Sequence, residues 1–351
     1  SLEERELYKL EAPDIGILFH SALSTMAENL RKKGRDFADL SKEECFQLAK
    51  EIVAQLAPQI QREIFRSSHR YRYIAKKLEE VVARAAYVLA EQGRRSQFTP
   101  IGHEIAFGRG GTLPPLTFQL SNGVEMELVG RIDRVDKAES EKGILLRVID
   151  YKSSGKNVDL VDVYYGLSLQ MLIYLDVLIT YSEQWLGEKA TPAGILYFHV
   201  HNPIVKANKP LSLEKIEEEI FKKFKMRGLI QADPQIAKLM DTSLETGYSN
   251  IIPVALSKSG SFYKNSSVIQ EDDFNEIRSF TRKKIVEIGE AMTTGNIDIA
   301  PIRDKQKIAC KFCPYKPVCQ FDPSLDTNDY HRLSSLSKDE VIEKIREGDG
   351  N

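Results

Sequence analysis

Residues 143–156 read GILLRVIDYKSSGK, an apolar, β-branched run that ends in closely spaced charges. The run follows the charged turn AESEK and opens on a glycine, which predicts a β-strand. Alternate side chains of a strand point to the same face, so Asp150 and Lys152 are expected to share one face and Tyr151 to point to the other. A surface ion pair at a strand end is the alternative explanation, and such a pair contributes only ~0–1 kcal/mol.

The composition is that of an ordinary globular protein. The chain has 351 residues, of which 42% are hydrophobic and 28% charged, with a formal net charge of −2. This charge indicates no general affinity for nucleic acid, so any contact with DNA must come from a local basic patch. No stretch has the ~20 apolar residues that cross a membrane, and the charged opening SLEERELYKLEAPD does not resemble a signal peptide. We therefore expect a cytoplasmic protein with no membrane partner and, because the first residue is not Met, a fragment of a larger chain.

The spacing of apolar residues changes along the chain. Residues 1–95 show helical spacing, whereas 96–205 contain the strand patterns FTPIGHEIAFG, LTFQLSNGVEMELVGRIDRVDK and AGILYFHVHNP, with a buried helix expected over about 161–182. Residues 206–300 are expected to be helical, and 301–351 contain a cysteine cluster and a charged tail. Helices, an antiparallel meander, a buried helix and a return strand predict an α/β core with helical flanks.

A second carboxylate precedes the opening stretch. Asp133, in ELVGRIDRVDK, lies in the preceding strand, and a hairpin can bring the ends of the two strands together. Two carboxylates beside a lysine suit Mg²⁺, which prefers oxygen ligands and activates a bound water for phosphodiester hydrolysis. The lysine can orient that water or neutralise charge. Arg134 and Asp136 leave a surface charge ladder as the alternative.

Four further polar residues are candidates. Gln170 and Tyr174 lie one helical turn apart in QMLIY, and burying the amide would cost a few kcal/mol (roughly 2–7) unless it is hydrogen-bonded. A satisfied core glutamine is the alternative. His20 in the first helix and Glu104 in GHEIAFG carry no signal individually, since a single histidine is more often packed or solvated.

Three cysteines near the C-terminus form a separate cluster. Cys310, Cys313 and Cys319 follow the spacing C-x2-C-x5-C. In a cytoplasmic chain such spacing favours a metal over a disulfide, and a zinc site would need a fourth ligand, for which His331 is the nearby histidine. A chance group of buried thiols is the alternative. The remaining cysteine, Cys45, lies in an amphipathic helical pattern.

The order of the motifs GILFHSAL, GHEIAFG, GRIDRVD, VIDYKSS and QMLIY resembles the RecB-like branch of the PD-(D/E)XK nuclease superfamily. The resemblance implies a restriction-endonuclease-like core, with a mixed central sheet flanked by helices, and Mg²⁺ as cofactor, for which Mn²⁺ can substitute. It also implies roles for individual residues: metal ligands His20, Asp133, Asp150 and the Tyr151 carbonyl; the catalytic lysine Lys152; Gln170 and Tyr174 organising the site or touching the DNA backbone; and Glu104 at a weaker motif position.

The cysteine triplet, the opening LEERELYKLEAPDIGILFHSAL and the strand GILYFHVHNP resemble AddB-type subunits of helicase–nucleases, so that the resemblance covers nearly the whole chain. This implies an exonuclease that cuts single-stranded DNA, on the 5′-ended strand, at unwound double-strand break ends during recombinational repair, in a heterodimer with an AddA-like helicase–nuclease. It also implies a [4Fe–4S] cluster on Cys310, Cys313 and Cys319, with a fourth cysteine upstream of this fragment, so that an intact cluster is expected to be absent here. No G-x-x-x-x-G-K-[ST] loop occurs, so no ATP site is expected.

Two other functions remain as alternatives. The first is a DNA-binding module whose nuclease core is an inactive scaffold, and the second is a free-standing RecB-like exonuclease. The set of His20, Asp133, Asp150 and Lys152 favours a nuclease over a scaffold, because a scaffold does not need metal ligands. The non-Met start and the missing fourth cysteine favour a subunit over a free-standing enzyme.

Overall fold

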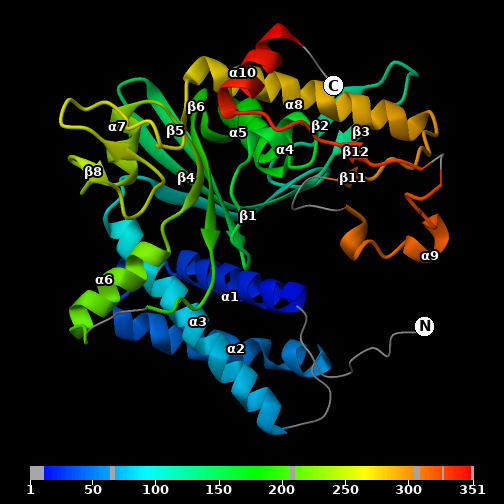
Figure 1. Cartoon of the computed structure of the whole chain (residues 1–351). Helices are drawn as coiled ribbons and strands as arrows, with labels where there is room; N and C mark the ends of the chain where they lie inside the picture. The colour runs from blue at the N-terminus through cyan, green and yellow to red at the C-terminus, as the bar shows by residue number, and fades with distance from the viewer. Residues whose placement is uncertain (1–11, 64–67, 206–209, 304–308, 326–327, 349–351) are drawn as a thin grey trace. The chain divides into compact units, whose positions relative to one another are not determined.

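A mixed β-sheet is the largest sheet in the computed structural model, which describes residues 12–63, 68–205, 210–303, 309–325 and 328–348 (Figure 1). Within these residues the main sheet has six strands in the order β1-β4-β5-β6-β7-β10. The strands of this sheet are β1 (Thr99–Phe107), β4 (Gly130–Ser140), β5 (Gly143–Lys152), β6 (Ala190–His199), β7 (Arg227–Gln231) and β10 (Val268–Ile269).

The other described elements are helices and short strand pairs. The α-helices are α1 (Ala12–Lys32), α2 (Lys42–Glu63), α3 (Ser68–Arg94), α4 (Leu160–Tyr164), α5 (Gln170–Leu186), α6 (Leu213–Lys223), α7 (Pro234–Met240), α8 (Glu271–Thr293), α9 (Lys316–Cys319) and α10 (Lys338–Glu347). Two 3-10 helices are described, η1 (Phe37–Asp39) and η2 (Ala309–Phe312). The short strand pairs are β2 (Leu116–Gln119) with β3 (Glu125–Leu128), β8 (Gly247–Tyr248) with β9 (Ala255–Leu256), and β11 (Ile302–Arg303) with β12 (His331–Arg332). No helix among the described residues is long and apolar enough to span a membrane.

The pairing of β5 explains why the sheet is mixed. Strand β5 pairs antiparallel with β4 through a tight turn, and parallel with β6 through a long crossover that includes α5. Parallel neighbours require such a crossover, and helices then cover the faces of the sheet. Residues Ile144–Tyr151 of β5 are all buried, which accounts for the continuous apolar run in its sequence. The prediction of a mixed central sheet flanked by helices is therefore confirmed.

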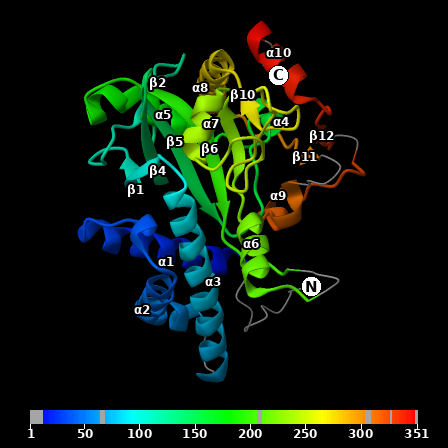
Figure 2. The same cartoon turned by 90° about the vertical axis from the view of Figure 1, so that its left-hand side faces the viewer.

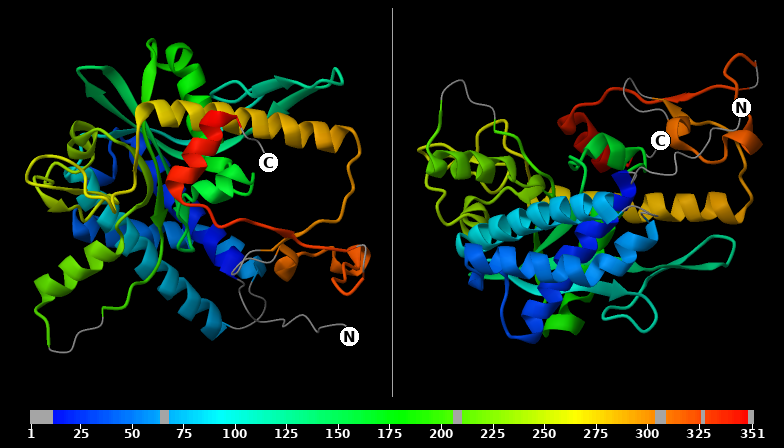
Figure 3. Two further views of the ribbon diagram at one scale, coloured as in Figure 1. Left: turned by 45° about the horizontal axis from the view of Figure 1, so that its top comes forward. Right: turned by 90° about the horizontal axis from the view of Figure 1, so that it is seen from below.

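Helices α1, α2 and α3 form a layer that shares a hydrophobic core with one face of the sheet. Figure 3 shows the three helices side by side, in blue to cyan. Buried residues of these helices, such as Leu23, Ile52 and Leu89, belong to the same core as Ile149 and Tyr151 of β5. Helix α6 lies beside α3 in both Figure 1 and Figure 2. The core fixes α1 against the sheet and therefore the position of His20.

The described chain divides into two compact units, each built from separate stretches. The first contains the described parts of Ser1–Pro115, Val129–Val158 and Met171–Phe274, and the second those of Leu116–Leu128, Asp159–Gln170 and Asn275–Asn351. The main sheet lies wholly in the first unit, and the β2–β3 hairpin, α9 and α10 lie in the second.

Two expectations about elements were wrong. The single buried helix expected over about 161–182 is divided into α4 and α5, because Gly166 adopts a left-handed conformation (φ 73°) that ends the first helix. The stretch 206–300, expected to be helical, also contributes β7 and β10 to the main sheet. The five residues of β7 are too few for a periodicity to be recognised, and their pairing with β6 decides their conformation.

Candidate metal centre and active site

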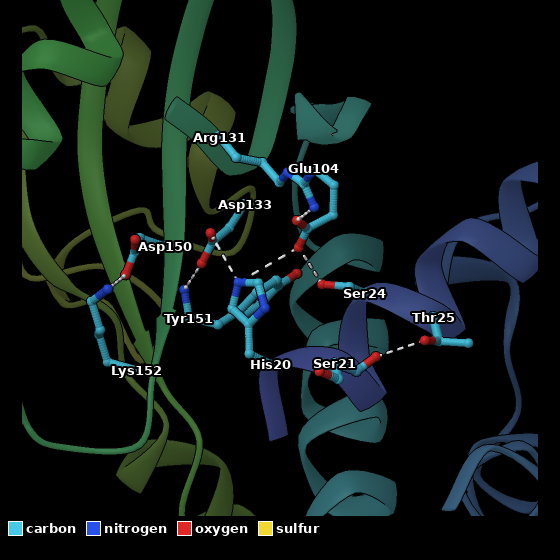
Figure 4. A network of polar contacts seen from close by, with 10 residues as sticks. All are labelled: His20, Ser21, Ser24, Thr25, Glu104, Arg131, Asp133, Asp150, Tyr151 and Lys152. Carbon is cyan, nitrogen blue, oxygen red and sulfur yellow. Dashed lines mark hydrogen bonds and ion pairs between the residues drawn. The ribbon is translucent and has the colours of Figure 1, made fainter. Parts of the chain in front are cut away.

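His20 extends from α1 toward the ends of the central strands, where it meets two carboxylates (Figure 4). Its Nε2 lies 2.9 Å from Asp133 Oδ1 and 3.5 Å from Glu104 Oε1. The apolar stripe of α1, including Leu18, Leu23 and Met26, is buried, so the histidine lies outside the stripe that anchors the helix. Its side chain is 33% exposed. The helix therefore positions His20 without needing it for packing.

Asp133 lies where β4 and β5 stop pairing. The last backbone pair of the two strands is Arg134 with Ile149, and one further step of the same register sets Asp133 opposite Asp150. At this step the Tyr151 amide donates a hydrogen bond of 2.9 Å to the Asp133 carboxylate instead of to a backbone carbonyl. The side chain thus replaces a ladder bond, which satisfies the buried amide and fixes one carboxylate oxygen.

Glu104 has an unusual backbone at the matching place in β1. Its φ is 52°, in the left-handed region that residues other than glycine rarely adopt, at a cost of ~1–3 kcal/mol. Its neighbours His103 and Ile105 pair with Arg134 and Ile132, so Glu104 lies across from Asp133. Ser24 donates a hydrogen bond of 2.5 Å to Glu104 Oε1. A strained residue held in this way points to a functional constraint.

Asp150 and Lys152 share a face of β5, as their spacing predicts. Lys152 Nζ lies 2.7 Å from Asp150 Oδ2. Asp150 is only 1% exposed, whereas the Lys152 side chain is 24% exposed. The alternative of a surface ion pair is therefore wrong, because the carboxylate is buried and only the lysine side chain is partly exposed.

The electrostatics of the site show an excess of negative charge. Burial and the neighbouring charge of Asp133 raise the pKa of Asp150 to about 6, although Lys152 and His20 oppose this shift. The hydrogen bond to Asp133 raises the pKa of His20, partly offset by burial. Both shifts have the same cause, since carboxylates crowded in a partly buried site bind protons more tightly and also stabilise a neighbouring cation.

The donor set fits a divalent cation. Ligand atoms of His20, Glu104 and Asp133 all lie within 4.8 Å of one another. Octahedral ligands at ~2.1 Å from Mg²⁺ are about 3 Å from their neighbours, close to the 2.9 Å between His20 Nε2 and Asp133 Oδ1. Carboxylates suit Mg²⁺ and Mn²⁺, and one imidazole is compatible with both. Asp150 stands next to this group, since its pKa responds to the charge of Asp133.

Gln170 and Tyr174 occupy α5. Gln170 is the first residue of that helix and is exposed, so the expectation that its amide is buried was wrong; the break after α4 places it at a helix end. Tyr174 is 8% exposed, and its ring packs edge-on against Phe107 at 6.0 Å. Their roles in organising the site or contacting DNA stay predictions, as does the role of the Tyr151 carbonyl.

The site also includes two residues that the sequence analysis missed, Ser24 and Arg131. Ser24 holds Glu104, and Arg131 Nη1 lies 3.5 Å from Glu104 Oε2 (Figure 4). A signal was present for each. Ser24 follows His20 by one helical turn, and Arg131 precedes Asp133 by two positions in a strand, so each shares a face with a predicted ligand.

The other face of β4 and β5 holds a buried ionic network. Asp136 is fully buried and accepts hydrogen bonds from Arg134 Nε at 2.7 Å and from Arg147 Nε at 2.9 Å. Burial alone would raise the pKa of Asp136, but the two guanidinium groups lower it. The alternative of a surface charge ladder is therefore wrong, because Arg134 and Asp136 point into the protein.

The three C-terminal cysteines lie around η2 and α9. Cys310, Cys313 and Cys319 are half-buried free thiols, whereas Cys45 is fully buried in α2. Among the described residues, His20, Glu104 and Asp133 are the group whose ligand atoms converge closely enough to hold an ion. The [4Fe–4S] assignment stays a prediction.

Comparison with known proteins agrees with this geometry. Residues 1–320 match the family model of the PD-(D/E)XK nuclease superfamily. The chain is 51% identical over all 351 residues to an ATP-dependent helicase/deoxyribonuclease subunit of Bacillus subtilis (strain 168), and 50% and 48% identical to proteins of the same name from Geobacillus kaustophilus and Oceanobacillus iheyensis. These matches include 99–100% of this chain, which spans only 30% of the length of each relative. The match over most of its length shows that the chain belongs to the PD-(D/E)XK nuclease superfamily.

Proposed function

We propose that this chain is a metal-dependent deoxyribonuclease that hydrolyses phosphodiester bonds in single-stranded DNA. The observation that supports the proposal is the convergence of His20, Glu104 and Asp133 beside the Asp150–Lys152 pair. A DNA-binding scaffold would have no need for a strained glutamate and a buried pair of aspartates, which reduce stability unless they serve a ligand.

In this proposal His20, Asp133 and Asp150 hold Mg²⁺, for which Mn²⁺ can substitute, and the Tyr151 carbonyl and Glu104 complete or orient the set. The bound ion makes a coordinated water more acidic and stabilises negative charge on the phosphate. The hydrogen bond from the Tyr151 amide keeps the Asp133 carboxylate in place before any ligand arrives. Ser24 does the same for Glu104.

Lys152 is the proposed catalytic lysine. Its stem is partly covered and its ammonium is held 2.7 Å from Asp150, so its position is fixed while its side chain remains 24% exposed. From there it can orient the attacking water or neutralise charge on the scissile phosphate. Gln170 and Tyr174 are proposed to organise the site or to contact the DNA backbone.

The names of the relatives suggest the wider setting. They are subunits of ATP-dependent helicase/deoxyribonucleases, so we propose that this chain works in a heterodimer with an AddA-like helicase–nuclease. Its substrate would be the 5′-ended strand unwound at double-strand break ends during recombinational repair. In the full-length protein, Cys310, Cys313 and Cys319 would supply three ligands to a [4Fe–4S] cluster.

Digestion of end-labelled oligonucleotides tests the proposal. The purified chain should shorten single-stranded DNA in Mg²⁺ or Mn²⁺ and leave it intact in excess chelator. Labels on the 5′ and 3′ ends in separate reactions report the polarity. Cleavage in chelator would contradict the metal assignment, and DNA binding without any cleavage would favour the scaffold alternative.

Variants of the charged pair sharpen the test. Asp150→Ala and Lys152→Ala should each lower the rate by roughly 10²–10⁴, because they remove a metal ligand and its charge partner. Lys142→Ala is the matched control, since this lysine adjoins the other end of β5 and pairs with Asp233 at the surface. Circular dichroism should show intact folds for all three. Unchanged cutting by a folded Lys152→Ala protein would remove the catalytic assignment.

A further inference from the structure

A second polar cluster adjoins the candidate active site at the ends of β5 and β6. In the parallel register of these strands His199 is the partner of Lys152. His199 Nε2 donates to the Ser153 carbonyl at 3.1 Å, and Arg227 Nη1 donates to the Gly155 carbonyl at 3.4 Å. The loop that follows Lys152 is thus held by a histidine and an arginine from neighbouring strands.

The cluster carries positive charge that no described carboxylate neutralises. Arg84, Lys223 and Arg227 all act electrostatically on His201. Within the described part of the chain, no acidic side chain lies within ion-pair distance of these three, and Arg84 bonds instead to the neutral side chain of Asn202 at 2.8 Å. Lys222, the neighbour of Lys223, differs in that its charge is neutralised, because it pairs with Glu218 at 2.7 Å and with Glu219 at 3.0 Å. Unneutralised surface cations suit a polyanion.

Two stacked histidines add a flat surface to the cluster. The rings of His199 and His201 lie 4.1 Å apart at an angle of 13°, and the ring of Phe224 lies 4.7 Å from that of His201. Both histidines are half-buried, so part of each remains open to solvent. Burial and nearby cations lower the pKa of both rings, which leaves them uncharged near pH 7. Uncharged aromatic faces stack on bases, and only a single strand exposes its bases for this contact.

We propose that Arg84, Lys223 and Arg227 bind the phosphates of a DNA single strand beside Lys152, and that the His199–His201 pair stacks on one of its bases. The proposal rests on the proposed nuclease function, whose substrate it positions. The three cations come from α3, α6 and the start of β7, and the core they share with the sheet holds them in fixed relation to the strand ends.

Binding measured without metal tests the proposal independently of cleavage. Fluorescence anisotropy of a labelled oligothymidylate with the 351-residue chain, in excess chelator, gives Kd at several salt concentrations. Lys223→Gln and Arg227→Gln should each raise Kd roughly tenfold at low salt, as expected for one lost charge-assisted contact. Each should also reduce the slope of log K against log salt by about 0.7. Lys222→Gln, which removes an ion-paired lysine, is the matched control and should bind like the unmodified chain.

The side chains of Lys223 and Arg227 are exposed, so neither variant should change the thermal midpoint. Equal affinities of both variants and the Lys222→Gln control would overturn the proposal, as would equal binding of a duplex of the same length. If the variants weaken binding but the unmodified chain cuts no DNA in Mg²⁺ or Mn²⁺, the binding surface stands and the nuclease proposal fails. If the unmodified chain cuts DNA but the variants bind it as tightly as the control does, the nuclease proposal stands and the binding surface fails.

Discussion

The carboxyl group of Asp150 is buried beside Asp133, and this raises its pKa to about 6 from an ordinary value near 3.8. A raised pKa in the folded state stabilises the fold at low pH, and this contribution is lost as the pH rises through 6. Asp150→Asn should therefore raise the free energy of unfolding by roughly 1–3 kcal/mol at pH 8 in chelator. At pH 4 the variant and the unmodified chain should be nearly equal. Urea titrations at both pH values measure this.

Saturating Mn²⁺ provides the control for that experiment. The ion should stabilise the unmodified chain at pH 8 and leave the Asp150→Asn variant nearly unchanged, because the variant lacks a charged ligand. A variant that is less stable than the unmodified chain at pH 8 in chelator would show that Asp150 supports the fold rather than a ligand.

His20 allows a separate test of the metal centre. It lies outside the buried stripe of α1, so His20→Ala should change the thermal midpoint little in chelator. Titration calorimetry should show weaker binding of Mn²⁺, by roughly 10–100-fold, because one ligand is lost. Ser21→Ala, at the adjacent position of α1, is a control for helix effects. Unchanged metal affinity with a large loss of stability would identify His20 as a structural residue.

At this scale the sequence predicted that Asp133, Asp150 and Lys152 lie close together, but it did not predict how they are held, and it missed Ser24 and Arg131. The two-residue spacing of Asp150 and Lys152 was sufficient to predict their shared face. The strained backbone of Glu104 and the bond from Tyr151 to Asp133 could not be foreseen, since both arise where strands from distant parts of the chain stop pairing. The burial of Asp136 could not be predicted either, because the alternation of side chains along a strand does not identify which face of the sheet is covered.

Among the elements, the β6–β7 pair depends on one glycine. Gly228 has φ 147°, and a Cβ built on it would lie 2.0 Å from the Ile195 carbonyl oxygen. Gly228→Ala should therefore separate β7 from β6 and destabilise the protein by more than about 3 kcal/mol, or prevent folding. Gly110→Ala is the matched control: φ is 74° there but nothing lies within 4 Å, so only the backbone strain of ~1–2 kcal/mol should appear. Denaturant unfolding compares the two, and equal costs would contradict this account.

Long, strongly patterned elements were predictable from the sequence and short ones were not. Strands β1, β4, β5 and β6 and the N-terminal helices follow from periodicity over many residues. By contrast, β7 and β10 are short and are defined by pairing with β6 and with each other. The break between α4 and α5 depends on Gly166, whose left-handed conformation is compatible with the sequence but not required by it.

For the whole molecule, the thiols limit what cofactor this chain can hold. A [4Fe–4S] cluster needs four protein ligands, and Cys310, Cys313 and Cys319 supply three. Cys45 is fully buried in α2, and burial raises the pKa of its thiol to about 11, so it is neither accessible nor ionised at neutral pH. We expect anaerobically purified protein to lack stoichiometric iron and the brown absorption of a cluster.

Iron analysis with absorption spectroscopy checks this expectation. Cys45→Ala should leave the low iron content unchanged, whereas Cys313→Ala should remove any residual iron. Stoichiometric iron that disappears in Cys45→Ala would show that this cysteine leaves its helix to complete the cluster.

Strand β4 carries the metal-site residue Asp133 on one face and the buried ionic network of Arg134 and Asp136 on the other. The register of β4 against β5 therefore determines both the active site and the pairing of the buried charges. If β4 slipped by one residue against β5, Arg134 would take the place of Asp133, and Asp136 and Arg134 would move away from Arg147 of β5. An unpaired buried charge lowers the free energy of unfolding by about 3–5 kcal/mol. A chain with the wrong register should therefore unfold and not persist as a folded but inactive protein. Replacing Arg134, Asp136 and Arg147 together by Met, Leu and Met should remove this penalty on the wrong register and change the free energy of unfolding little. Amide NMR spectra would then show more than one set of β4 signals, and a single set would contradict the idea.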